Sequence, residues 1–242
     1  MSCTPPTDNV MVSFVARFDG EPVSCQSQPH AVTDLRFYLS DITLISREGK
    51  LAPVDLDVDE RWQSSAVAMI DLEDGANACT NGTADTYAAV RGTAAKGDYS
   101  GLAFTVGVPF ELNHQDPLAA DAPLGDPDMH WHWRGGYKFI RAGVTDGERT
   151  FWLHLGSTGC EGTIQNITGC SAPNRMHVEF PDFDVANDRV AIDVSTLLAL
   201  AVDEGVTSCS SGPAEAACEA TFTALGINTN AAQRLFQVES QP

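Results

Sequence analysis

Apolar and polar residues alternate with a period of two along much of this chain, which is the pattern of half-buried β-strands. The clearest alternating stretches are Val10–Phe18, Leu35–Leu39, Leu102–Val108, Phe151–Leu155 and Met176–Phe180. Clusters rich in Gly, Pro, Asp and Asn separate the strands, as at residues 19–22 and 47–50. Short strands joined by such turns are typical of a mainly β protein, and we predict an antiparallel β-sandwich.

Helical patterns are confined to the C-terminal third of the chain. Ser195 or Thr196 can cap a helix through the apolar run 197–200, a second helix is expected at 214–225, and a short last one after Asn230. Residues 113–128, in contrast, carry three prolines, four aspartates and little periodicity. Long ordered loops in compact domains are usually functional, so we expect this loop to lead into a site.

Length and charge restrict the class of protein. We expect the 242 residues to form a single domain, with residues 1–8 as a flexible tail. The formal net charge of -19, from 33 acidic and 14 basic residues, argues against nucleic acid and anionic membranes as partners. No apolar run is long enough to predict a transmembrane helix.

Cysteine usage indicates an oxidising compartment, either the periplasm or the cell exterior. The expected disulfides are Cys160–Cys170, Cys209–Cys218 and Cys25–Cys79. The first two are preferred because short loops close easily, and the third follows by elimination, although six cysteines allow many pairings. The seventh, Cys3, is either the lipid-bearing cysteine of a bacterial lipoprotein or part of a disordered tail.

The segment Met129–Trp133 gathers two of the four tryptophans, two of the six histidines and one methionine. Imidazole and thioether groups suit soft and borderline metals, which makes this segment a candidate metal site. On a strand, His130 and His132 would face the same side and could supply two ligands. The alternative is a solvent-facing pair of histidines beside two core tryptophans.

Two further histidines are candidates. His154 alternates with Phe151, Leu153 and Leu155 and therefore leaves the core, either as an ordinary surface residue or as part of a site on the outer face of the sheet. His114 follows the end of a predicted strand, where binding residues often lie.

Several phrases resemble the MbnP-like family of bacterial periplasmic copper proteins, the partners of diheme cytochrome c peroxidase-like (MauG-like) enzymes. The phrases are Asp34–Tyr38, Gly107–Phe110, Leu112–His114, Met129 with Trp131-His132-Trp133, Gly136–Arg141 and His154–Cys160, and the late Cys209 and Cys218 also fit. They run through most of the chain in order.

The resemblance implies a copper-binding protein that is not itself an enzyme. It implies that the diheme partner oxidises Trp131, the first tryptophan of W-x-W, to kynurenine, and that the modified residue and histidines hold one copper, usually Cu(I). An indole nitrogen cannot coordinate because its lone pair belongs to the ring, whereas the aromatic amine of kynurenine can. His114 and His154 lie within the matching phrases and are our first choices as ligands, with Met129 and His132 as weaker ones.

Two other functions compete with this hypothesis. One is a zinc or copper enzyme built on His130 and His132 with His154, which would need an acidic residue beside the metal to act on a bound water. The other is a metal-free binding sandwich that uses exposed tryptophans to hold a carbohydrate or a protein.

Overall fold

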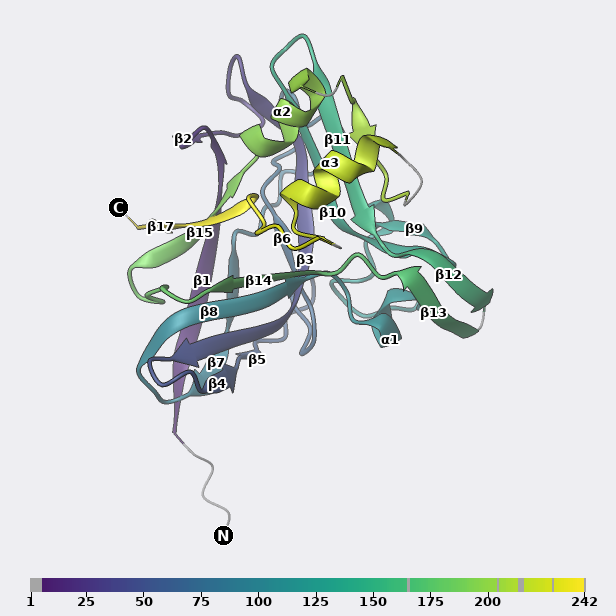
Figure 1. Cartoon of the computed structure of the whole chain (residues 1–242). Coiled ribbons are helices and arrows are strands. Elements are labelled where there is room, and N and C mark those ends of the chain that lie inside the picture. The colour runs from purple at the N-terminus through teal and green to yellow at the C-terminus, as the bar shows by residue number, and fades with distance from the viewer. Residues whose placement is uncertain (1–5, 165, 204, 213–215, 228, 242) are drawn as a thin grey trace.

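In the computed structural model, which describes residues 6–164, 166–203, 205–212, 216–227 and 229–241, the chain is mainly β and forms two large packed sheets, as the alternation predicts. The strands are β1 Thr7–Phe18, β2 Glu21–Pro22, β3 Ala31–Ser46, β4 Leu51–Pro53, β5 Asp55–Leu56, β6 Ala68–Asp71, β7 Ala89–Ala95, β8 Tyr99–Val106, β9 His130–His132, β10 Gly136–Thr145, β11 Thr150–Gly156, β12 Thr158–Thr163, β13 Asn166–Ala172, β14 Met176–Phe180, β15 Asp188–Asp193, β16 Ser208–Cys209 and β17 Phe236–Ser240. The helices are α1 Phe110–Asn113, the 3-10 turn η1 Pro127–Met129, α2 Ser195–Asp203 and α3 Ala216–Ala224. Figure 1 shows the β12–β13 hairpin projecting from one side, beyond β9 and α1.

The smaller of the two sheets has the order β17-β15-β1-β7-β5, and β2 pairs with β1. The larger has the order β14-β8-β3-β10-β11-β16, with β4 and β6 also paired to β3 and β9 paired to β10. Most pairs are antiparallel, as expected, but β1 with β15 and β11 with β16 are parallel. These strands are distant in sequence, so the intervening chain provides the crossover that a parallel pair requires.

Aromatic side chains join the two sheets in the core. Phe14 of β1 packs edge to face against Phe37 of β3 at 5.7 Å and Phe104 of β8 at 6.1 Å, measured between ring centroids. Phe236 of β17 lies 5.5 Å from Phe37 and 5.7 Å from Phe104. Such pairs add to the burial of apolar surface, so this cluster fixes how the sheets face one another.

Strand β3 is buried on both faces. Leu35, Phe37 and Leu39 point into the sandwich core, as their alternation predicts, while Asp34 and Arg36 on the opposite face are only 2% and 3% exposed. That second face is covered partly by the long loop after α1, where the Tyr38 hydroxyl donates to the carbonyl oxygen of Pro123 at 3.2 Å. The loop therefore lies over the outer face of the large sheet.

All three expected disulfides are present: Cys25–Cys79, Cys160–Cys170 and Cys209–Cys218. Cys160 and Cys170 are directly opposed in the β12–β13 hairpin. Each bridge contributes about 2–4 kcal/mol by restricting the unfolded chain.

The helices agree only partly with the sequence patterns. The two longer ones follow residue 194, as predicted, but the stretch after Asn230 forms strand β17 and not a helix, because it pairs with β15 from Asp188 to Ile192. Strand β1 begins at Thr7, within the stretch expected to be a tail, because Thr7 pairs with Ala95. Cys3 lies outside the described residues. No helix in the described part of the chain is long and apolar enough to cross a membrane.

Candidate metal centre

Trp131 lies in the middle of β9, which pairs with the start of β10. Its indole ring is half-buried and meets the imidazole of His154 edge to face, with the ring centroids 6.4 Å apart and the planes at 73°. The ring also lies against Gly156, where an added Cβ would be 2.8 Å from Trp131 Cζ3. The end of β11 therefore supplies both a histidine neighbour for the indole and the space into which it fits.

His154 points away from the sandwich core, as the alternation along β11 predicts. Burial among its neighbours lowers its pKa to about 4, and the positive charges of Lys138 and Arg141 add to this shift while Asp34 opposes it. A histidine pKa below 6.5 means that the folded protein favours the neutral ring. At neutral pH His154 thus keeps a nitrogen lone pair available for a metal.

His114 ends the short helix α1, and its position depends on the preceding residue. The buried Asn113 donates from Nδ2 to the carbonyl oxygen of Gly135 at 3.3 Å and accepts from the backbone N–H of Tyr137 at 3.0 Å. Gly136 lies between these partners with φ +76°, and an added Cβ there would be 2.1 Å from the Asn113 carbonyl oxygen. These contacts join His114 to the turn that directly follows β9.

The imidazole of His114 faces the hairpin disulfide, with Nε2 3.6 Å from Cys170 Sγ. Burial lowers the pKa of His114, although a contact with the backbone of Trp133 acts in the opposite sense. Nδ1 is buried without a well-formed hydrogen bond. His114, Cys160 and Cys170 bring their donor atoms within 4.8 Å of one another, but the two sulfur atoms are bonded together and do not form thiolates.

The weaker candidates occupy different environments. Met129 is completely buried in the hydrophobic core. His132 is exposed, and its Nδ1 accepts the backbone N–H groups of Arg134 and Gly135, both at 3.2 Å, which leaves Nε2 free to coordinate. His130 packs edge to face on Tyr137 at 5.2 Å, and its Nε2 is buried without a hydrogen-bond partner.

Trp131 and His132 line a surface cavity of about 460 Å³, which is bounded on its other side by Ser157–Cys160 and Ser210. Cys160 in this wall is bonded to Cys170, which contacts His114. The disulfide therefore connects the surroundings of Trp131 to those of His114.

Trp131 and His154 are in contact, and His114 is tied to the same β9–β10 turn. In the described part of the chain, however, the groups of three or more His, Cys, Asp or Glu donors within 4.8 Å include neither His154 nor the pair His130 and His132.

Comparisons with known proteins agree with the resemblance seen in the sequence. The sequence profile of the MbnP family matches residues 7–213. The chain belongs to the MbnP family. Its structure is similar to that of MbnP from Methylosinus trichosporium, with a TM-score of 0.81, 28% sequence identity, and coverage of 98% of this chain and 100% of that one. Among curated proteins, none matches the chain.

Two residues that contribute to this site were missed as functional residues by the reasoning from sequence. Asn113 directly precedes His114, and Gly156 follows His154 by two residues, both within phrases shared with the MbnP family. Neither residue has a side chain that suggests a ligand. Their roles are positional, since Asn113 anchors His114 and Gly156 makes room for Trp131.

Replacing Gly156 with alanine should displace the Trp131 ring. The new Cβ would be 2.7 Å from the Tyr137 carbonyl oxygen and 2.8 Å from Trp131 Cζ3, so we expect a loss of about 1–3 kcal/mol in the free energy of unfolding. Urea unfolding measures that loss, and near-ultraviolet circular dichroism reports the tryptophan environment. The matched control is Gly169→Ala on β13, where an added Cβ meets nothing within 4 Å. Equal stability of the two variants would contradict the close contact.

Proposed function

We propose that this protein binds copper in the periplasm, and that its metal site is completed when a diheme enzyme oxidises Trp131 to kynurenine. The kynurenine amine, His114 and His154 then hold Cu(I). The observation that carries the proposal is the contact of Trp131 with His154 near the end of β11. Membership of the MbnP family supports it.

The modification is a hydrolytic oxidation of the indole. The side chain takes up three water molecules, its five-membered ring opens, and one ring carbon leaves as formic acid. Four electrons and four protons are released. The electrons pass to the diheme partner and from there to two molecules of hydrogen peroxide, each of which takes up two electrons and two protons and is reduced to water. The product carries a free aromatic amine, whose lone pair can coordinate a metal.

The position of Trp131 suits electron loss to a partner protein. The ring is half-buried and lines an open cavity, so an enzyme docked on this surface can approach it. The net charge of -19 favours a partner with a basic docking surface, because complementary charge speeds encounter.

The donor atoms of the proposed site suit Cu(I). Neutral imidazoles and an aromatic amine give a nitrogen-rich site of low coordination number, which a soft monovalent ion accepts. The lowered pKa of His154, to about 4, and that of His114 keep both rings neutral at neutral pH. Neither ring then has to lose a proton before it binds the metal.

Co-expression with and without the diheme partner tests this function. With the partner, intact mass should show the change from tryptophan to kynurenine, peptide mapping should place it at Trp131, and the protein should hold one copper per chain. Without the partner, the mass should be unmodified and tight copper absent.

Histidine variants made under the same conditions test the ligands. His154→Ala and His114→Ala should each lose the copper while kynurenine still forms. The control is His177→Ala, since His177 lies on the exposed face of β14, beside Glu179. A different result would favour a site built on His130 and His132. In that case, protein that lacks kynurenine would still hold copper tightly, and His132→Ala would lose it.

A further inference from the structure

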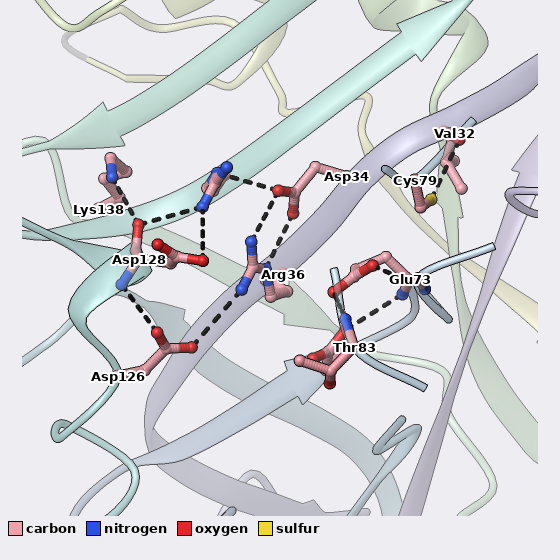
Figure 2. Close-up of polar contacts among 12 residues, drawn as sticks. Val32, Asp34, Arg36, Glu73, Cys79, Thr83, Asp126, Asp128 and Lys138 are labelled. Atoms are coloured by element: carbon pink, nitrogen blue, oxygen red, sulfur yellow. Dashed lines mark hydrogen bonds and ion pairs between the residues drawn. The ribbon is translucent and has the colours of Figure 1, made fainter. Parts of the chain in front are cut away.

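A buried ion cluster lies on the outer face of the large sheet (Figure 2). Arg36 of β3 makes a bidentate pair with Asp34, with distances of 3.0 Å and 2.8 Å. Arg141 of β10 approaches the same carboxylate, with its Nε 2.9 Å from Asp34 Oδ2. The side chains of Asp34 and Arg36 are 2% and 4% exposed, so these charges are almost completely withdrawn from water.

The cations of this region hold the chain segment that leads into Trp131. Arg36 pairs with the Asp126 carboxylate at 3.5 Å. Arg141 donates to the Asp128 carbonyl oxygen at 3.3 Å. Lys138 donates to the same carbonyl at 2.6 Å and to that of His130 at 3.5 Å. Three cations from two adjacent strands thus fix backbone and side-chain oxygens along residues 126–130, which directly precede Trp131.

Two of these cations, Arg36 and Arg141, lie in register with His154, the histidine on which Trp131 packs. Arg141 is directly opposite Arg36 on one neighbouring strand and opposite His154 on the other. One side chain therefore stands between the strand that carries Asp34 and the strand that carries His154. Arg141 also reaches Asp128, in the segment that leads into Trp131, so it links both parts of the candidate centre.

Stability alone does not explain such a cluster. Removing charges from water costs several kcal/mol per ion, and buried ion pairs are often no more stabilising than apolar residues of similar size. What a buried pair can provide is a unique arrangement, because its donors and acceptors are satisfied in only one geometry. Here that geometry includes the backbone next to Trp131.

We propose that Asp34, Arg36, Lys138 and Arg141 form a positioning cluster that holds the backbone of Asp126–His130 and thereby keeps Trp131 against His154. None of these four residues is itself a ligand. The significance of the cluster for copper rests on the function proposed above, whereas its effect on the place of Trp131 does not.

Fluorine NMR of the metal-free, unmodified protein labelled with fluorotryptophan tests the positioning directly. The Trp131 resonance is assigned by its loss in Trp131→Phe. Arg141→Gln should shift or split this resonance. The matched control is Arg17→Gln: Arg17 has the same 14% side-chain exposure and pairs with Glu239, but it lies on β1 in the other sheet.

A second variant guards against loss of folding in Arg141→Gln. Lys138→Met keeps the apolar stem of the side chain and removes both hydrogen bonds to the loop carbonyls. After co-expression with the diheme partner, folded Arg141→Gln or Lys138→Met should bind copper about 10- to 100-fold more weakly than the parent, as expected for residues that orient a metal site. Arg141→Lys should recover part of this loss, while Arg17→Gln should bind copper normally.

The outcomes separate the two proposals. An unchanged Trp131 resonance in folded Arg141→Gln and Lys138→Met would overturn the positioning cluster, whatever the protein binds. A shifted resonance in a protein whose parent acquires neither kynurenine nor copper would support the positioning and overturn the proposed function. Equal changes at Trp131 in Arg141→Gln and Arg17→Gln would mean a general loss of stability and would also overturn the cluster.

Discussion

The Trp131→Phe protein, isolated after co-expression with the diheme enzyme, should contain no tightly bound copper and yet be folded. Phenylalanine fills most of the space of the indole beside His154 and Gly156, so packing is largely kept. It has no ring nitrogen that oxidation could release as an amine. With one donor missing, the remaining histidines no longer complete a site, and copper per chain should fall from about one to near zero in metal analysis of the dialysed protein.

Trp133→Phe is the matched control for this result. Trp133 lies two residues further along, is also half-exposed, and stacks on the Arg134 guanidinium at 4.9 Å from the ring centroid. Its replacement should leave kynurenine at Trp131 and the copper in place. One tight copper per chain in Trp131→Phe would contradict the kynurenine mechanism. If that copper were then lost when His132 is also replaced, the pair His130 and His132 would be the better assignment of the site.

Most of the fold could be predicted from the sequence because its strands have one apolar face. Phe151, Leu153 and Leu155 are all buried, as their spacing predicts, and β14 shows the same alternation. The short cysteine spacings likewise identified two bridges whose residues lie in neighbouring elements. In each case the signal is local, within a strand or a short loop, and does not depend on distant parts of the chain.

The outer face of β3 could not be predicted in this way. Polar residues at Asp34 and Arg36 give the pattern of a solvated face. In the structure they are covered by a loop that includes Asp126, about 90 residues further along the chain. Likewise, the parallel pairing of β1 with β15 depends on partners far apart in the chain. Patterns within a short window contain no information about such partners.

The candidate metal centre was predictable only in part. The phrases shared with the MbnP family singled out Trp131, His114 and His154, and the structure brings Trp131 and His154 into contact. The structure also joins His114 to the turn after β9 through the hydrogen bonds of Asn113, and no sequence pattern indicated this link. Met129 was chosen for its thioether, but its apolar side chain is also well suited to the core, where it lies. The ligand assignment itself stays a prediction.

A large effect on stability is expected at Asp71, a residue of β6 that lies opposite Arg36. The residue is 3% exposed, and burial raises its pKa to about 8, with the charges of Glu73 and Asp34 acting in the same direction. Arg36 and the Glu73 backbone N–H oppose this shift but do not cancel it. Asp71 is therefore protonated in the folded protein at neutral pH, and Arg36 is left to pair with Asp34 and Asp126.

Asp71→Asn should stabilise the protein at neutral pH and have little effect in acid. Between the ordinary pKa of 3.8 and the raised value of about 8, the unfolded chain releases a proton that the folded protein retains, so stability falls as pH rises. Asparagine cannot ionise and keeps the oxygen that accepts the Glu73 N–H at 3.1 Å. Urea unfolding should therefore show a gain in the free energy of unfolding on the order of 2–4 kcal/mol at pH 7 and almost none at pH 4.

Asp98→Asn, at a side chain that is 78% exposed, is the control and should show no such difference between the two pH values. A gain that is equal at both pH values, or a loss at pH 7, would mean that Asp71 is ionised in the folded protein.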